Sequence, residues 1–437
     1  MDDYYHGLLW APPAMAQSII DLGTLGGPSS QATAINASGQ VVGKSWITAD
    51  GAVIHAFLYA DGVMIDLGTL GGSVSYANGI NDSGEIAGYS NLTGDTTQDA
   101  FLYSGGSMTD LGAFGGSGSY AFAINASGQI VGSWSQTDAT NGPGASFLYS
   151  GGVMTDLGTL GGTWSYALGI NASGQIVGYS WINTTDSSPY HGYLYSGGVM
   201  TDLGTLPYGS DSQANGINAS GQVVGSSYTL VGPHAFLYSG GVMTDLGTLP
   251  GDGQGYSKGI NASGQVVGYS VSKDGSLYRA FLYSGGAMID LNSLLPANSG
   301  WFRLTEAYAI NDFGQIAGSG IVNGATHAFL LNLTSLSPSS ATAGGAAFTL
   351  KVTGIGTNFV PGATVNWNGT VLATTYVSAT EMTASVPASL IAAAGTASVA
   401  VTTNEGTLAG GTFAIYAPRA LPGEPERPRG TMPREQR

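Results

Sequence analysis

Five tryptophans between residues 17 and 333 are the side chains best suited to hold a ligand: Trp46, Trp134, Trp164, Trp181 and Trp301. Each falls in or beside a variable segment of the chain. Exposed indole rings commonly stack on sugar rings or anchor a protein partner. We therefore expect a glycan or a protein to bind at these residues. The alternative is that the rings fill space between neighbouring sheets at strand ends.

Four histidines occupy one recurring position, two residues before an aromatic side chain: His55, His191, His234 and His327. Zinc requires several imidazoles within about 2 Å of one ion. Equivalent positions of a repeat are spread apart rather than convergent, so we expect no metal and no cofactor here. A local hydrogen bond that fixes the strand is the favoured role.

An aspartate opens each Asp-Leu-Gly segment, or the variant Asp-Leu-Asn: Asp21, Asp66, Asp110, Asp156, Asp202, Asp245 and Asp290. A calcium loop supplies a dense run of oxygen ligands, whereas each of these carboxylates stands alone in its segment. We expect them to stabilise turns or to form hydrogen bonds between repeats.

Catalysis has one candidate, Glu306, which lies close in sequence to Arg303 and Trp301. No second acid can be paired with it from the sequence, and a glycosidase needs two. The chain also lacks a recognisable Ser-His-Asp order or phosphate-binding glycine loop. We expect no catalytic residue and no enzyme; a polysaccharide-acting hydrolase or lyase at Glu306 is the alternative.

All these residues belong to a unit that recurs seven times, marked by the asparagine of an Asn-x-(Ser/Phe)-Gly turn. The asparagines are Asn36, Asn81, Asn125, Asn171, Asn218, Asn261 and Asn311. Within one unit, the runs 165–171, 175–180, 191–196 and 199–204 are short, rich in β-branched or aromatic residues and bounded by Gly, Asn or Ser. Such runs are typical of strands. A four-stranded meander of about 45 residues is a propeller blade.

The ends of the array predict that it closes. Residues 18–23 form a fourth strand without a third, and 327–331 form a third strand without a fourth. We expect the N-terminal strand to complete the last unit of a seven-bladed β-propeller, which removes two exposed sheet edges. The connections between second and third strands, and between successive units, then share one face, here called the loop face. These connections vary, as binding loops do.

Composition agrees with an all-β chain and excludes some partners. The 437 residues include 71 Gly, 9% are charged, and the formal net charge is −16. From 17 to 333 there are 20 acids and 5 bases, so nucleic acid is not expected as a partner. There is no cysteine, and no apolar run is long enough for a membrane span.

The two ends of the chain differ from the repeats. Residues 1–16 contain Ala14-Met15-Ala16, a pattern typical of a signal-peptidase site, so we expect a remnant export signal cleaved after Ala16; the alternative is a plain leader. Alternating runs and Gly or Pro turns over 334–416 predict a small β-sandwich, with a hairpin turn at 367–369. The segment 417–437 is rich in Pro and charge and is expected to be disordered.

Two families resemble parts of this chain. The units over about 18–332, with His-Ala-Phe at His55, His234 and His327, resemble the HAF repeat of bacterial extracellular proteins. The sandwich resembles an IPT/TIG immunoglobulin-like domain, on the pattern Pro338, Gly344, Gly354, Phe359, Gly362, Val365 and Trp367-Asn368-Gly369. These resemblances imply export and a modular protein. We expect a secreted or cell-surface, non-enzymatic binding or structural protein.

Overall fold

The computed structural model describes residues 19–135, 144–183, 189–296, 298–354, 359–403 and 406–418. The expected leader at 1–16 lies outside these residues, as does the expected disordered tail except for 417 and 418. The described chain consists of strands, with two short 3₁₀ helices. The prediction of an all-β protein is therefore confirmed. No helix in these ranges is long and apolar enough to cross a membrane.

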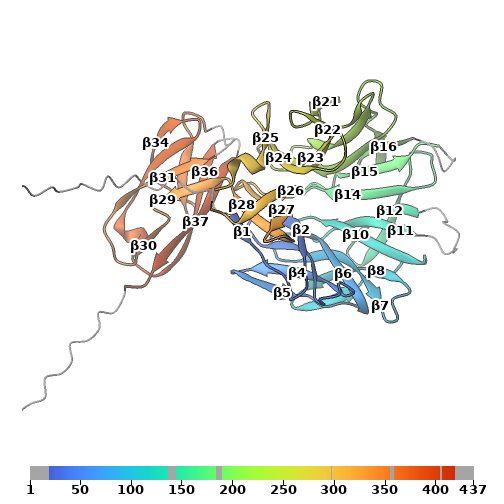
Figure 1. Cartoon of the computed structure of the whole chain (residues 1–437), viewed down its shortest axis with the longest axis horizontal. Helices are drawn as coiled ribbons and strands as arrows, with labels where there is room; N and C mark the ends of the chain where they lie inside the picture. The colour runs from blue at the N-terminus through green and yellow to red at the C-terminus, as the bar shows by residue number, and fades with distance from the viewer. Residues whose placement is uncertain are drawn as a thin grey trace, which may run out of the picture.

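Two β-rich parts follow each other along the chain (Figure 1). The strands of the first half of the repeat region are β1 Ile19–Asp21, β2 Ser30–Ile35, β3 Val41–Trp46, β4 Ile54–Ala60, β5 Val63–Asp66, β6 Gly71–Ile80, β7 Ile86–Leu92, β8 Gln98–Ser104, β9 Ser107–Asp110, β10 Gly118–Ile124, β11 Ile130–Ser135, β12 Gly144–Ser150 and β13 Val153–Gly158. The second half contains β14 Ser165–Ile170, β15 Ile176–Trp181, β16 Tyr190–Ser196, β17 Val199–Asp202, β18 Ser212–Ile217, β19 Val223–Thr229, β20 Gly232–Ser239, β21 Val242–Gly247, β22 Asp252–Ile260, β23 Val266–Ser272, β24 Tyr278–Ser284, β25 Ala287–Asp290, the 3₁₀ helix η1 Leu291–Leu294, β26 Trp301–Ile310, β27 Gln315–Val322 and β28 Ala325–Asn332.

These strands form consecutive antiparallel meanders. Four-stranded sheets are made by β10–β13, β14–β17, β18–β21 and β22–β25, while β2–β9 form two meanders joined by a single parallel pair, Ile54 with Val74. The last sheet has the order β1-β28-β27-β26, because the N-terminal strand pairs with β28. The first strand of the chain thus supplies the outer strand of the last sheet, as the incomplete ends predicted.

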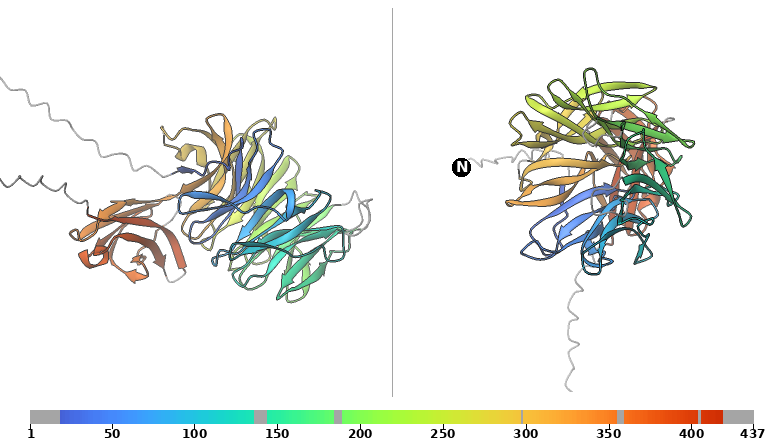
Figure 2. Two further views of the ribbon diagram at one scale, coloured as in Figure 1. Left: turned by 90° about the horizontal axis from the view of Figure 1, so that it is seen from below. Right: turned by 90° about the vertical axis from the view of Figure 1, so that its right-hand side faces the viewer.

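Side-chain amides of the repeated asparagines link the meanders in a closed circuit. Each Asn Nδ2 donates to the backbone carbonyl of the next asparagine at 3.0–3.2 Å, and Asn311 donates back to Asn36. Figure 2 shows the sheets placed side by side around a common centre, with β26–β28 beside β2–β4. The repeat region therefore has a β-propeller-like arrangement.

A ring packed over a glycine forms the core of each sheet. The third strand buries one aromatic side chain completely: Phe57, Phe101, Phe147, Tyr193, Phe236, Phe281 or Phe329. Each lies opposite a second-strand glycine, as Phe101 does opposite Gly88. A Cβ on Gly88 would lie 1.9 Å from the Tyr76 carbonyl and 2.7 Å from the Phe101 ring. This close approach explains why Val-Gly and Ala-Gly pairs recur in the second strands; each buried ring contributes about 1.5–3 kcal/mol.

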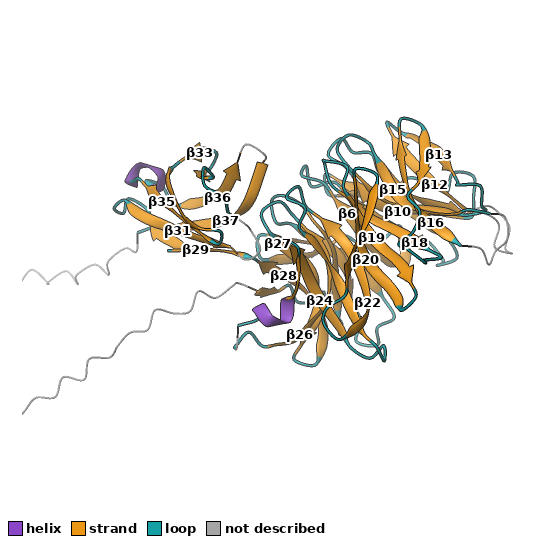
Figure 3. Ribbon diagram, turned by 90° about the horizontal axis from the view of Figure 1, so that it is seen from above, coloured by secondary structure: helices purple, strands orange, loops and turns teal. Residues whose placement is uncertain are grey.

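The second part has its own core. Its elements are β29 Thr334–Ser337, β30 Ser340–Thr342, β31 Phe348–Gly354, β32 Thr364–Trp367, β33 Thr370–Val371, β34 Ala373–Ser378, β35 Glu381–Val386, the 3₁₀ helix η2 Ala388–Ile391, β36 Gly395–Thr403 and β37 Gly406–Tyr416. They form two sheets, β29-β31-β35-β34 and β30-β37-β36-β32-β33. Trp367 packs between them, 4.9 Å from the Phe413 ring. The hairpin predicted at 367–369 joins β32 to β33. Figure 3 shows this part beside the repeat region, with one 3₁₀ helix in each.

Candidate functional site

Stacked tyrosines mark the first and second strands of several meanders. Cross-strand pairing places Tyr76 opposite Tyr89 and Tyr256 opposite Tyr269, with ring centroids 4.9 and 5.0 Å apart. Tyr89 also contacts Tyr120 of the next meander at 5.1 Å. Such directly opposed aromatic pairs stabilise a sheet. The contact between Tyr89 and Tyr120 extends the first pair to the neighbouring meander.

The aromatic rings of these strands form three groups of ring contacts, and we call the whole set the aromatic belt. Its members are Tyr76, Tyr89, Tyr120, Trp164, Tyr166, Tyr179, Trp181, Tyr190, Tyr256, Tyr269 and Tyr278. Tyr190 opens the third strand of its sheet, opposite Trp181, with the two rings 5.6 Å apart. Every member is half-buried except Tyr278, which is more exposed, at 41%. A mixed apolar and hydroxyl-bearing surface therefore lies on the loop side of the inner strands.

Burial keeps the tyrosine hydroxyls protonated. It raises the pKa of Tyr89 to about 12 and the pKa of Tyr190 to about 12, in both cases with help from nearby ionisable groups. The pKa of Tyr256 is also raised to about 12, mainly by burial. At neutral pH these hydroxyls are uncharged; the Tyr256 hydroxyl donates to Gln254 Oε1 at 2.8 Å, and the hydroxyls of Tyr89 and Tyr190 can donate hydrogen bonds to a ligand. They suit a polar, hydroxyl-rich ligand.

Three charged side chains stand among the rings. Lys44 Nζ lies 4.9 Å from the Tyr76 ring centroid and 5.7 Å from that of Trp46. Lys258 Nζ lies 5.7 Å from the Tyr269 ring centroid. Glu306 Oε2 accepts a 2.7 Å hydrogen bond from the Tyr308 hydroxyl and a 3.3 Å bond from Ser319 Oγ.

The Glu306 carboxylate affects the pKa of both lysines. Burial lowers the pKa of Lys44, and burial lowers the pKa of Lys258, while in each case the Glu306 carboxylate acts in the opposite direction. Lys258 and Tyr308 both occupy the bulge of their first strand, where the ladder skips a residue. A bulge commonly redirects a side chain beside a functional site.

The five tryptophans do not form one surface. Trp164 and Trp181 belong to the aromatic belt, and Trp46 lies under Lys44. Trp134 contacts Phe114 at 5.2 Å, and its buried indole N–H has no hydrogen-bond partner within the described ranges. Trp301 is 8% exposed and packs edge-on against Phe329 in the core. Its ring fills space at a strand start, so we leave Trp301 out of the ligand face.

Sequence reasoning missed the most exposed apolar side chains of the loop face. Tyr208 is 85% exposed, Leu230 80%, Phe302 76% and Val231 75%. They occupy connections or strand starts whose sequence differs between units. This difference is the signal by which the sequence could have identified them. Beside Val231 lies a hollow of about 500 Å³, lined also by His234, Asp252, Gly253, Gln254 and Lys273.

The histidines and the Asp-Leu-Gly carboxylates pair with one another. His55 Nδ1 lies 2.8 Å from Asp66 Oδ1, and the same contact joins His191 to Asp202, His234 to Asp245 and His327 to Asp21. The aspartate also caps its own turn, as Asp66 Oδ1 does by accepting from Gly68 N. The predicted local roles of both residue types are confirmed. No group of three metal-ligating side chains occurs among the described residues.

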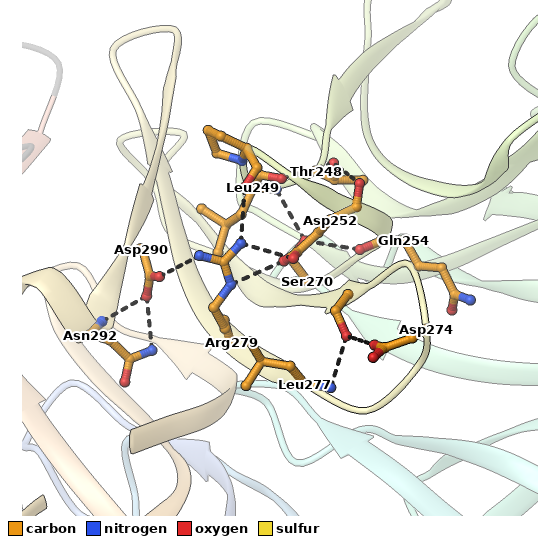
Figure 4. A network of polar contacts seen from close by, with 12 residues as sticks. Thr248, Leu249, Asp252, Gln254, Ser270, Asp274, Leu277, Arg279, Asp290 and Asn292 are labelled. Carbon is orange, nitrogen blue, oxygen red and sulfur yellow. Dashed lines mark hydrogen bonds and ion pairs between the residues drawn. The ribbon is translucent and has the colours of Figure 1, made fainter. Parts of the chain in front are cut away.

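One meander uses arginine at the histidine position (Figure 4). Arg279 contacts Asp290 of β25 at 3.0 Å and Asp252 of β22 at 2.9 Å, and it donates to the Pro250 carbonyl. Asp290 in turn accepts from Asn292 N at 2.9 Å. The longer arginine side chain therefore connects β24 to β22, to β25 and to the segment at Pro250, whereas each histidine connects only two strands.

Comparison with known proteins identifies the C-terminal part. Residues 331–415 match the IPT/TIG domain, so the predicted resemblance of the C-terminal sandwich to that domain is confirmed. No curated protein matches the chain. Among solved structures, TolB from Acinetobacter baumannii is similar at 14% identity and a TM-score of 0.36, covering 68% of this chain and 80% of TolB. A Ca²⁺-stabilised adhesin that helps an Antarctic bacterium reach out and bind ice is similar at 13% identity and a TM-score of 0.16, covering 93% of this chain and 100% of the adhesin. Neither likeness supports a conclusion about this chain.

Proposed function

We propose that the repeat region is a seven-bladed β-propeller closed by its N-terminal strand and built from HAF repeats. The closed circuit of seven asparagines and the pairing of β1 with β28 support this architecture. Closure leaves the loop face as the variable surface of a rigid scaffold. The assignment of residues 17–333 to the propeller and of 334–416 to the sandwich follows from it.

The propeller acts as a binding module for a glycan, without catalysis. The observation that carries this proposal is the aromatic belt, which offers partly exposed rings and neutral hydroxyls together on the loop side. Flat rings stack on the apolar faces of sugars, and hydroxyl groups exchange hydrogen bonds with theirs. The proposed ligand contacts include Trp46, Trp134, Trp164 and Trp181, joined by Tyr190 and Tyr208.

A glycan array tests this function directly. The double substitution Tyr208→Ala with Tyr278→Ala removes one proposed contact and one ring of the aromatic belt, both of them exposed, and should leave the fold intact. We expect wild-type protein to bind a defined set of glycans, and the variant to bind them about tenfold more weakly, a loss of about 1.4 kcal/mol.

Tyr416→Ala is the matched control, since that ring is 64% exposed on the IPT/TIG domain. An equal loss in this control, or unchanged binding by the double variant, would contradict a glycan site on the loop face. Binding of an extracellular protein is the second candidate for this face. The exposed Leu230 and Val231 side chains favour it, because aliphatic tips of this kind suit a protein surface better than a sugar.

An enzyme remains the alternative class. Glu306 is held by Tyr308 and lies near two lysines, which would suit a polysaccharide lyase or hydrolase. Release of reducing ends from a polysaccharide panel, abolished by Glu306→Gln, would favour this alternative over the binding module.

We also propose that the protein is secreted or displayed at the cell surface. The IPT/TIG domain at 331–415 is compatible with this location, and the candidate cleavage site after Ala16 supports it. Detection of mature protein beginning at Gln17 outside the cell would test the proposal.

A further inference from the structure

The repeat region contains few basic residues, and several of them lie on the first or second strand of a meander. The chain carries a net charge of −16, yet Lys44, Lys258 and Arg303 all lie on the first or second strands of their meanders. A protein of this charge repels anions at long range. Three of the five basic residues in 17–333 lie on first or second strands, whereas Lys273 follows β23 and Arg279 lies on β24.

The topology brings Lys44 and Lys258 to the two sides of Glu306. Lys258 belongs to β22, Glu306 to β26, and Lys44 to β3, whose partner β2 adjoins β26 across the closure. A Cβ on Gly259 would lie 3.0 Å from the Tyr308 carbonyl, which shows how closely β22 and β26 pack. Two lysines and one glutamate thus lie on three neighbouring sheets.

Neither ammonium group forms an ion pair within the described residues, although the Glu306 carboxylate raises the pKa of both against the effect of burial. Within the described residues, no carboxylate lies within 4 Å of Lys44 Nζ or Lys258 Nζ, and neither donates a hydrogen bond; Arg279 and Lys351, in contrast, form ion pairs. Lys44 Nζ lies over the rings of Tyr76 and Trp46, and Lys258 Nζ lies over the ring of Tyr269. Glu306 already accepts hydrogen bonds from Tyr308 and Ser319. Burial disfavours the charged form of both lysines, and an anionic oxygen of a ligand within hydrogen-bond distance would favour that form.

We propose that Lys44 and Lys258 bind the anionic group of an acidic sugar, a uronate or a sulfated residue, whose ring stacks on the tyrosines beside them. This proposal rests on the glycan-binding function above and specifies the class of glycan. Carboxylate and sulfate share the chemistry that a lysine recognises, since both present oxygen anions to a compact cation. The tyrosine hydroxyls, which stay protonated, complete the contacts to the sugar hydroxyls.

Calorimetry with matched trisaccharides tests the proposal. The probes are α-1,4-linked trigalacturonate, its fully methyl-esterified form, and a galactose trisaccharide carrying 6-sulfates. We expect the free acid to bind wild-type protein at least tenfold more tightly than the ester. Comparable binding of the sulfated trimer would support recognition of either anion, and its rejection would assign the site to carboxylates.

Substitutions then locate the preference. Lys44→Gln with Lys258→Gln should reduce binding of the acid to the level of the ester, while the ester itself binds as before and so reports an intact fold. Lys44→Arg with Lys258→Arg should retain the preference, because the charge remains. Lys273→Gln makes the same change at an exposed lysine beside the hollow near Val231 and should have no effect.

Distinct outcomes separate the two proposals. Equal binding of acid and ester, a preference that survives the double glutamine variant, or a loss caused by Lys273→Gln would each overturn the assignment to Lys44 and Lys258. Binding of neutral glycans alone on the array would overturn it while leaving the glycan-binding function standing. Binding of no glycan at all would overturn both.

Discussion

At the residue scale, the position two residues before the buried aromatic ring of the third strand accepts different side chains in different units. His55, His191, His234 and His327 each face the aspartate of their own sheet. Arg279 keeps the same partnership with Asp290 through a longer side chain. Asp99 occupies the equivalent position and faces Asp110, so two acids meet where the other sheets pair a cation or an imidazole with an acid.

This like-charge contact leads to a prediction for Asp99→Asn. Burial raises the pKa of Asp99 from its usual 3.8, and the Asp110 carboxylate adds to the effect. The folded state therefore holds a proton on Asp99 more readily than the unfolded state, and stability falls as the pH rises through the raised pKa. Removing the charge should stabilise the protein at pH 7 by up to about 1 kcal/mol, because Asp110 is exposed to solvent.

Urea unfolding at pH 7 and at pH 3 checks this expectation. The advantage of the asparagine variant should disappear at pH 3, where Asp99 is protonated in both states. Asp61→Asn, at an exposed turn, provides a control that should change little at either pH. A variant that is less stable than wild type at pH 7 would contradict the proposed repulsion.

At the element scale, a serine on the first strand joins neighbouring sheets. Ser75 Oγ accepts from Ala56 N of the preceding sheet at 2.8 Å and donates to the Gly68 carbonyl at 2.6 Å. Ser30 repeats both contacts with Ala328 N and the Gly23 carbonyl. The junction between the last and the first sheet is thus built like the junctions within the chain.

Deleting the closing strand should destabilise this junction. A variant that lacks residues 1–22 loses β1, the buried Leu22 and the contact between Asp21 and His327. Because burial of one aliphatic side chain contributes about 1.5–3 kcal/mol, and Ile19 is lost as well, we expect a loss of at least about 3 kcal/mol. Tryptophan fluorescence during urea unfolding would measure it.

A variant that lacks only residues 1–17 keeps β1 and serves as the control. Equal stability of the two deletions would show that β1 does not hold the last sheet to the first.

At the scale of the whole molecule, the asparagine circuit passes through every meander of the repeat region. Asn171 is buried, and its Nδ2 donates to the Asn218 carbonyl at 3.1 Å and to Gln175 Oε1 at 2.8 Å. Its Oδ1 accepts from the backbone N–H groups of Ser173 and Gln175. Glu85 takes the place of the glutamine in one turn and accepts from Asn81 at 2.7 Å.

Opening the circuit at one asparagine should weaken the whole ring. Asn171→Ala removes the acceptor of two backbone N–H groups and the donor to the next sheet, and each buried group left without a partner costs about 1–3 kcal/mol. We expect a loss of about 3 kcal/mol in the unfolding of the repeat region, measured by calorimetry. Ser38→Ala, at an exposed position of an equivalent turn, should cost under about 0.5 kcal/mol.

Local features of this protein could be predicted because they depend on neighbours in sequence. The Asn-x-Ser-Gly turn, the Asp-Leu-Gly cap and the tight hairpin at Asn368-Gly369 each follow from backbone geometry that few residues adopt. The pairing of β1 with β28 was predictable as well, because each end of the array was short of one strand.

The tertiary structure alone decided which side chains meet. Lys44, Lys258 and Glu306 are far apart in sequence, and they converge only because β22, β26 and β2 become neighbours around the ring. Trp301 and Trp181 both lie at strand ends, yet one ring packs into the core and the other joins the aromatic belt. Short-range backbone preferences determine the strands and turns of each repeat, so the sequence predicts them. Which side chains form the candidate site depends on how the sheets pack against one another, and a local sequence pattern does not contain this information.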